Sequence, residues 1–340
     1  MSRVLILGTG LIGASIGAGL RDTGWTVVGW DPVPAALDEA ERMGALNEIT
    51  DDVPGTADTS DLVVLAGPVG AIIDTLNGLR TETLVTDVAG VKGPIVEAGR
   101  HLSHFVGGHP MAGRESSGPG AASSSMFRGA SWVLTTDHAT DADLAMMEEV
   151  VAALGAVPVR MTSAEHDTAV AAVSHVPQVL ASALVNMVAE DGGALSLAAG
   201  GFRDVTRIAL SEPAWWTEIL TQNRGEISRL VRSLSSDLVK WADQIEAGDR
   251  QTVADGLESA RQTRRRLTAP VAAVQVLLED RPGEVARVGH ALAESAVDVR
   301  DLQLRHATRG GGGVLTLSVL PGQEASLRSA LEAEGFRLVG

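Results

Sequence analysis

Short apolar runs alternate with stretches of helical periodicity over the first 160 residues or so. The apolar runs are rich in β-branched residues and have the length of strands, and the stretches between them are long enough for helices. Strands that alternate with helices indicate βαβ units and a parallel sheet. The predicted strands are 4–7, 26–30, 62–65, 84–87, 105–107 and 132–135.

The strand signal stops at Ser163 and does not return until about residue 270. We expect a helix to start there, with Ser163 as its N-cap and a kink near His175 caused by Pro177. Long amphipathic helices need a partner surface, which predicts a helical dimerisation domain over 163–268 and a homodimer. The apolar stripe of one such helix consists of Ile227, Leu230, Val231, Leu234, Leu238, Trp241 and Ile245.

The last 70 residues return to a mixed pattern after a short linker at 268–270. The order of predicted elements is βαββαβ, which is the ferredoxin-like order. We therefore expect a third domain over 270–340, after a first domain over 1–162. Its predicted elements are the strands 271–278, 297–305, 314–319 and 336–339 and the helices 284–295 and 323–334.

Composition narrows the classes of protein that this chain can be. Of its 340 residues 45% are hydrophobic, so it can bury a sizeable core in two or three domains. The absence of cysteine excludes disulfide scaffolds, cysteine-ligated zinc and cysteine nucleophiles. A net charge of −16 repels phosphate backbones, so we expect no nucleic acid partner. We find neither an apolar run of ~18 residues nor a signal-peptide pattern, which predicts no membrane span and a cytoplasmic protein.

A glycine-rich loop follows the first predicted strand and opens a predicted helix. Its sequence, Gly8-Thr9-Gly10-Leu11-Ile12-Gly13, fits the pattern G-x-G-x-x-G, in which glycines let the backbone approach a pyrophosphate. Asp31 ends the second strand, where a carboxylate binds the ribose 2′-hydroxyl and repels a 2′-phosphate. We predict NAD rather than NADP, held by Gly8, Gly10, Leu11, Ile12, Gly13 and Asp31. The alternative is a glycine-rich turn without a ligand.

Histidine and arginine supply the candidate chemistry. His109 follows a strand end and is flanked by glycines, which suits a general base near neutral pH, although an isolated histidine is more often structural. Arg203 and Arg207 have the i,i+4 spacing of one helix face and suit carboxylate recognition, unless they pair with nearby acids. His166 and His175 share a helix face, but no third ligand has metal spacing, so we expect no metal.

In their order along the chain, these motifs resemble the prephenate/arogenate dehydrogenase family of tyrosine biosynthesis, and the tail resembles an ACT domain. The resemblance implies NAD-dependent oxidation and decarboxylation of prephenate to 4-hydroxyphenylpyruvate. It also implies that His109 accepts the proton of the ring C4 hydroxyl and that Arg207 holds a substrate carboxylate. The other implied substrate contacts are Glu115, which also gates the pocket, His166, His175, Gln178 and Trp216. The motifs that carry the resemblance are Gly8–Gly13 with Asp31, Thr86-Asp87-Val88, Val91-Lys92, Gly107–Gly118, His166-Asp167, Ser174–Pro177 and Gly201–Trp216.

Two positions depart from the usual pattern of the family. A Gly-Ser pair is Ala89-Gly90 here, so a serine hydroxyl is missing, and Ser117 or a water is a candidate substitute. A histidine is replaced by Gln178, which can donate to a carboxylate or accept from an ammonium. The sequence therefore leaves open whether the substrate is prephenate or arogenate. It is also compatible with a different β-hydroxyacid dehydrogenase and with a non-catalytic protein that senses NAD and amino acids.

The tail contains none of the catalytic candidates, which is typical of a regulatory module. The resemblance to ACT domains implies that an aromatic amino acid, tyrosine first and phenylalanine or tryptophan next, binds at the first turn of this domain. The residues of that turn are Asp280 to Gly283, at a predicted helix N-terminus that favours a carboxylate. The alternative is a domain that only strengthens the dimer.

Overall fold

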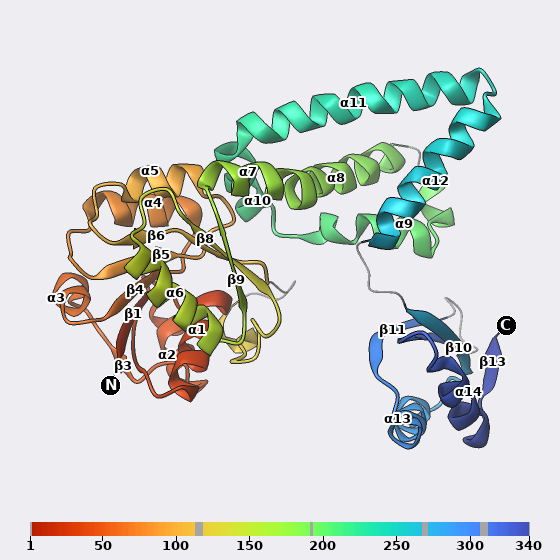
Figure 1. Cartoon of the computed structure of the whole chain (residues 1–340), viewed down its shortest axis with the longest axis horizontal. Coiled ribbons are helices and arrows are strands. Elements are labelled where there is room, and N and C mark those ends of the chain that lie inside the picture. Colours follow the sequence, from red (N-terminus) through yellow and green to blue (C-terminus); the bar gives the residue numbers. More distant parts are fainter. Residues whose placement is uncertain (1, 113–117, 191–192, 267–270, 307–311, 340) are drawn as a thin grey trace. The chain divides into compact units, whose positions relative to one another are not determined.

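The apolar runs of the N-terminal part form a six-stranded parallel sheet (Figure 1). Its strands are β1 (Arg3–Leu7), β2 (Thr26–Trp30), β3 (Glu48–Ile49), β4 (Leu62–Leu65), β5 (Leu84–Asp87) and β6 (Phe105–Val106). The order β3-β2-β1-β4-β5-β6 is that of the Rossmann fold, which confirms the fold predicted for this part. Continuous apolar runs such as Leu62–Leu65 are expected here, because helices cover both faces of such a sheet.

The computed structural model describes residues 2–112, 118–190, 193–266, 271–306 and 312–339. The chain divides into two compact units, Met1–Asp237 and Leu238–Gly340. In the first unit, α1 (Leu11–Asp22) and α6 (Asp141–Ala153) contribute to one buried apolar cluster. The other cluster includes α4 (Val69–Gly78) and α5 (Gly93–Gly99). The shorter helices of this region are α2 (Pro34–Arg42) and α3 (Val53–Asp58).

A second, three-stranded sheet follows the parallel one and was not predicted. It consists of β7 (Gly108–Pro110), β8 (Ser131–Thr135) and β9 (Val157–Met161). β7 pairs with β8 in antiparallel fashion, with His109 opposite Val133. The prediction that 132–135 joins the parallel sheet was therefore wrong, because this strand pairs only with β7 and β9 among the described residues. His109 lies on a short strand rather than in a loop.

The region after β9 is helical, as predicted. The helix starts one residue earlier than expected, because Thr162 is the N-cap and forms a capping box with Glu165. Near Pro177 the chain forms five residues of π-helix, η2 (Ala171–His175), between α7 (Ser163–Val170) and α8 (Val176–Ala189). The remaining elements are η3 (Ala194–Leu197), α9 (Gly200–Thr206), η4 (Arg207–Leu210), α10 (Pro213–Gln222) and α11 (Arg224–Glu246).

The stretch Ser163–Ala189 is long and apolar enough to cross a membrane, by length and composition. This is weak evidence of a membrane span, because the core helix of a soluble protein passes the same test. Four polar side chains in its first half are buried inside the protein: Ser163, His166, Asp167 and His175.

The second unit holds the rest of α11, α12 (Arg250–Arg266) and a four-stranded antiparallel sheet. The sheet has the order β11-β12-β10-β13, and it buries an apolar core that includes Val288 and Leu327 of its helices. The predicted βαββαβ order is present, although the predicted hairpin lies partly in 307–311, outside the described residues. Its elements are β10 (Ala272–Leu278), α13 (Glu284–Ser295), β11 (Val299–His306), β12 (Gly313–Val319), α14 (Glu324–Ala333) and β13 (Arg337–Val339).

Gly13 allows the first helix to lie against the loop that follows β1. A Cβ atom on Gly13 would lie 1.9 Å from the carbonyl oxygen of Gly8, so the backbone would have to move. We expect Gly13→Ala to lower the free energy of unfolding by at least ~2 kcal/mol. Gly10→Ala is the matched control, because nothing lies within 4 Å of a Cβ there, and it should cost less than ~1 kcal/mol. Urea denaturation of both variants measures this, and equal midpoints would contradict it.

Candidate active site

The glycine-rich loop leaves room beside the N-terminus of α1. Gly8 has φ +100°, and a Cβ atom there would lie 2.6 Å from the carbonyl oxygen of Ala66. At Gly10, by contrast, the space that a Cβ would occupy is open. The N-cap of α1 is Gly10, which has no side chain to bond the first N–H groups of the helix and so leaves them to an anion. Leu11 and Ile12 begin this helix, and their loop therefore fits the pyrophosphate of a dinucleotide.

Asp31 is fixed between this loop and the end of β2. Its Oδ2 accepts a hydrogen bond from the backbone N–H of Thr9 at 2.7 Å, and its Oδ1 accepts one from the N–H of Val33 at 2.9 Å. The carboxylate is partly exposed and stands beside the glycine-rich loop. This is the position expected of a group that binds a ribose hydroxyl.

A buried ion pair holds the backbone next to His109. Asp87 ends β5 and contacts Lys92, and both side chains are fully buried. Asp87 Oδ1 accepts from the N–H of Gly108 at 3.1 Å, and Lys92 Nζ donates to the carbonyl oxygen of Gly108 at 2.7 Å. Burial raises the pKa of Asp87 and lowers that of Lys92, against the attraction between the two. The pair therefore binds both backbone groups of the residue that precedes His109.

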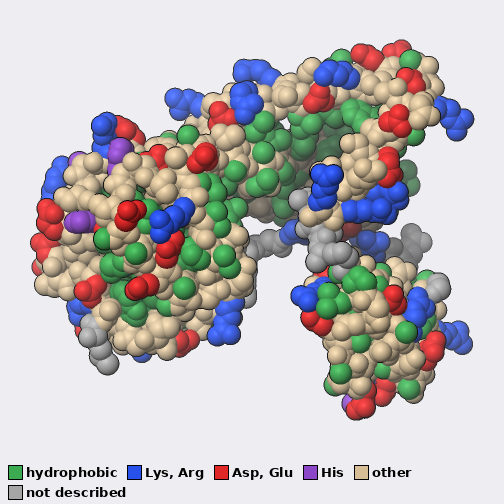
Figure 2. Space-filling model, in the orientation of Figure 1, with side chains coloured by type: hydrophobic (Ala, Val, Ile, Leu, Met, Phe, Trp, Pro, Cys, Tyr) green, Lys and Arg blue, Asp and Glu red, His purple; other side chains and the backbone are tan. Residues whose placement is uncertain are grey.

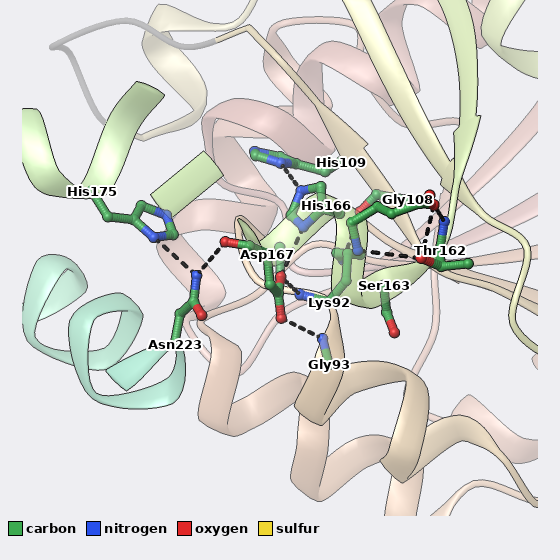
Figure 3. A network of polar contacts seen from close by, with 12 residues as sticks. Lys92, Gly93, Gly108, His109, Thr162, Ser163, His166, Asp167, His175 and Asn223 are labelled. Carbon is green, nitrogen blue, oxygen red and sulfur yellow. Dashed lines mark hydrogen bonds and ion pairs between the residues drawn. The ribbon is translucent and has the colours of Figure 1, made fainter. Parts of the chain in front are cut away.

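The imidazole of His109 is held from the other side by α7 (Figure 3). His109 Nδ1 lies 2.8 Å from His166 Nε2, and His166 Nδ1 lies 2.8 Å from Asp167 Oδ1. Asp167 also accepts hydrogen bonds from the backbone N–H groups of Lys92 at 2.7 Å and Gly93 at 2.8 Å. The segment 87–93 is thus tied to both the backbone beside His109 and its ring.

The free nitrogen of His109 faces the space beside Gly90. A Cβ atom on Gly90 would lie 3.7 Å from His109 Nε2 and 3.9 Å from Ile219 Cδ1. Burial holds the pKa of His109 well below 6.5, and the nearby His166, Lys92 and His175 lower it further. A neutral imidazole with one hydrogen-bonded nitrogen can accept a proton at the other. His109 therefore has one nitrogen, Nδ1, that is hydrogen-bonded and another, Nε2, that lies beside Gly90.

His175 and Trp216 lie on the neighbouring helices. Asn223 donates from Nδ2 to the backbone oxygen of Asp167 at 2.8 Å and lies 3.4 Å from His175 Nδ1. The rings of His175 and Trp216 meet edge to face, with centroids 6.0 Å apart. Burial lowers the pKa of His175 to about 4, so this ring is neutral at pH 7. Short π-helical segments such as the one that ends at His175 are frequent at functional sites.

The other predicted substrate residues have different positions. Gln178 is 5% exposed, and its Oε1 is buried without a hydrogen-bond partner in the structure as described. The regular helix predicted to run through Arg203 and Arg207 ends at Thr206, so the two arginines do not share one α-helical face. Arg207 instead begins η4, which packs beside α8. Glu115 and Ser117 lie outside the described residues.

Sequence reasoning missed Asn223 and the functions of Asp87 and Lys92 in the network. The signal for the ion pair was present, because Asp87 and Lys92 are charges in an otherwise apolar run after β5. Nothing in the sequence around Asn223 distinguishes it from other helix-end residues. The described ranges contain no group of three or more acidic or histidine side chains that could hold a metal ion.

The chain was compared with known proteins. Residues 16–160 match the prephenate dehydrogenase nucleotide-binding domain, and residues 162–259 match the prephenate dehydrogenase dimerization domain. The probable prephenate dehydrogenase NovF of Streptomyces niveus is 32% identical over 94% of this chain and 95% of its own length.

Solved structures give the same result. Prephenate dehydrogenase from A. aeolicus, in complex with hydroxyphenyl propionate and NAD+, has a TM-score of 0.74 at 28% identity, over 79% of this chain and 99% of that one. Synechocystis arogenate dehydrogenase has a TM-score of 0.71 at 30% identity, over 78% of this chain and 100% of that one. With its Rossmann-type domain, its helical dimerisation domain and these relatives, the chain belongs to the prephenate dehydrogenase family of NAD-dependent oxidoreductases.

Proposed function

We propose that this enzyme oxidises prephenate to 4-hydroxyphenylpyruvate with NAD and that His109 is its general base. The observation that carries the proposal is the orientation of His109. Its Nδ1 is bound to His166 at 2.8 Å, and its Nε2 faces the space beside Gly90. A base that is fixed on one side and open on the other suits the removal of a hydroxyl proton.

The proposed reaction divides the work between the cofactor and the protein. Bound NAD supplies the acceptor for the hydride that leaves ring carbon C4. His109 Nε2 takes the proton of the C4 hydroxyl, which makes C4 a ketone. The ring carboxylate then leaves as CO2, its bonding electron pair passes through the ring to the C4 oxygen, and that oxygen takes up a proton to give the aromatic phenol. The gain in aromaticity drives this step. Positioning and base catalysis are the contributions of the chain itself.

The substrate's carboxylates and side chain need partners around His109. We assign a carboxylate to Arg207, whose guanidinium can bind it through two hydrogen bonds. We assign the wall of the pocket to His175 and Trp216 and its gate to Glu115. His166, which is fully buried between His109 and Asp167, is assigned a place behind this wall.

Arogenate is a second candidate substrate, and Gln178 is the observation that favours it. Arogenate has an ammonium group where prephenate has a keto oxygen. The buried Oε1 of Gln178 has no partner among the described side chains, and an ammonium would supply the missing donor. A keto oxygen could instead accept from the amide nitrogen of the same side chain.

The assay is NADH formation with prephenate and arogenate, side by side. We expect His109→Asn to lower kcat by ~10²–10⁴-fold and to leave the Kd of NAD nearly unchanged, because the base acts only in the chemical step. His101→Asn is the matched control, since His101 is exposed near α5 and lies outside the network of Figure 3. Normal turnover of His109→Asn across the pH range would rule out the base, and inactivity of the wild type with both substrates would rule out the function.

The preference for NAD over NADP is proposed to depend on Asp31. A 2′-phosphate would be repelled by the carboxylate of Asp31, whose Oδ2 accepts a hydrogen bond from the backbone N–H of Thr9 at 2.7 Å. We expect kcat/KM with NADP to be at least 10²-fold lower than kcat/KM with NAD. In Asp31→Ser this difference between the two cofactors should become smaller, mainly because NAD binds more weakly. Steady-state kinetics with both cofactors test this, and equal kcat/KM values for the wild type would contradict it.

The helical part is proposed to form a homodimer in the cytoplasm. Figure 2 shows hydrophobic side chains gathered over α8. Several apolar side chains of this region are more than half exposed: Val173, Met187, Leu197, Val205, Leu210 and Trp215. Exposed apolar area of this extent is typical of an interface.

The C-terminal sheet is proposed to be an ACT domain that binds an aromatic amino acid at the turn 280–283. A pocket of about 610 Å³ adjoins that turn and is lined by Arg281, Arg287, Arg305 and Arg337. The buried Glu284 accepts from Arg281 and Arg287 at 2.8 Å each, at the N-terminus of α13 after Gly283. Because Arg281 and Arg287 already bind that carboxylate, Arg337 is a better contact for the effector's carboxylate.

Regulation is tested with the full-length enzyme. We expect 1 mM tyrosine to change the rate and Arg337→Ala to weaken that response at least 10-fold, since the variant removes a cation from the pocket. Arg300→Ala, on β11 and paired with Asp298, is the control outside the pocket. If tyrosine, phenylalanine and tryptophan leave the rate unchanged, or act equally on Arg337→Ala and wild type, the domain has no regulatory site there.

A further inference from the structure

Asp167 is connected to the ring of His109 through one other side chain (Figure 3). Its Oδ1 lies 2.8 Å from His166 Nδ1, and His166 Nε2 lies 2.8 Å from His109 Nδ1. His166 is fully buried, and Asp167 is 8% exposed. The three side chains form one hydrogen-bonded chain from a carboxylate to the base.

The donors in this chain follow from its carboxylate end. Asp167 accepts two backbone N–H groups besides His166. Burial raises its pKa, but the hydrogen bonds from His166, Gly93 and Lys92 lower it by more, so the carboxylate is ionised at pH 7. An ionised carboxylate has no proton to give, and His166 must therefore donate from Nδ1. With its single proton on Nδ1, His166 can accept at Nε2, and His109 then donates to it from Nδ1.

We propose that Asp167 is a positioning residue that acts through His166 to keep the proton of His109 on Nδ1, so that Nε2 is the nitrogen that takes the substrate's proton. The proposal adds to the proposed function and rests on it for the reaction. The nitrogen of a histidine that carries the proton is set by the hydrogen bond that the other nitrogen makes. Without this chain, His109 could hold its proton on Nε2 and would then be a donor to the substrate.

The surrounding charges show why a carboxylate is needed at this point. When His109 accepts a proton it becomes a cation within a buried cluster that includes the ammonium of Lys92 and the rings of His166 and His175. Asp87 is committed to Lys92 and to the backbone of Gly108. Asp167 is the carboxylate that is hydrogen-bonded to His166, and His166 connects its charge to the base.

Three variants separate positioning from structure. In Asp167→Asn the side chain is neutral and can donate to His166, which permits His109 to carry its proton on Nε2. We expect kcat to fall ~10²–10⁴-fold with KM nearly unchanged. In His166→Gln the amide oxygen can still accept from His109 Nδ1, so the loss should be no more than ~10-fold. His166→Leu has no acceptor and should resemble Asp167→Asn.

The pH profile gives a second readout. Only neutral His109 is active, so activity falls on the acidic side as that ring gains a proton. Loss of the Asp167 charge makes the His109 cation less favourable, and the acidic limb of kcat/KM should move to lower pH in Asp167→Asn. A role limited to stability would lower the amount of active enzyme without moving this limb.

Imidazole 15N NMR of the full-length enzyme reads the proton position without any turnover. We expect His109 to carry its proton on Nδ1 in the wild type and in His166→Gln, and to shift toward Nε2 in His166→Leu. This measurement tests the proton position of His109 separately from the proposed function, because the spectrum does not depend on which substrate is used. Wild-type protonation on Nε2, or wild-type kcat in both Asp167→Asn and His166→Leu, would overturn the assignment.

Discussion

The position of His109 depends on one buried ion pair. Asp87 and Lys92 are both fully buried, and each binds one backbone group of Gly108. A buried charge without its partner is strongly destabilising, commonly by ~3–5 kcal/mol, so neither residue can be lost alone at low cost. The pair therefore acts as a rigid link between the end of β5 and the strand that holds His109. Helix α7 adds a second link to the same segment, through the backbone N–H groups of Lys92 and Gly93.

The same arrangement explains why the histidines of the site are suited to accept protons. His109 and His175 both have pKa values below the ordinary value, mainly because of burial. A neutral ring next to Lys92 costs less than a charged one, and it is the neutral ring that can act as a base at pH 7. The low pKa of His109 is thus a consequence of its burial in the domain interior.

Much of the fold could be predicted from the sequence. Leu62–Leu65 is a continuous apolar run, and the strands Thr26–Trp30 and Leu84–Asp87 each contain a short one, so local pattern was sufficient to identify all three. The short strand β7 was missed, because three residues with two small side chains carry no periodicity, and its pairing with Val133 is a tertiary contact. The same holds for the helix through Arg203 and Arg207, where spacing gave no sign of the change to a 3₁₀ turn at residue 207.

Within the site, the candidate residues were predicted more successfully than the hydrogen bonds that join them. His109, His166 and His175 were recognised as candidates, and the structure joins them into one network with Asp167 and Asn223. The chain of hydrogen bonds spans residues 87 to 223, and contacts at such separations depend on the three-dimensional arrangement alone. Asn223 is an example, because its side chain meets Asp167 only once α10 has ended beside α7.

The π-helical turn Ala171–His175 bears on how this helix can change in length. A π turn holds one residue more than an α turn, so removal of one residue from it would leave a continuous helix of almost the same hydropathy. Because the wide turn accommodates that extra residue, its removal would leave the residues after it, Gln178 among them, on nearly the same faces of the helix. The change would be confined to the backbone of 171–175. A one-residue gap in this stretch of a related sequence would accordingly be compatible with the same pocket and the same fold.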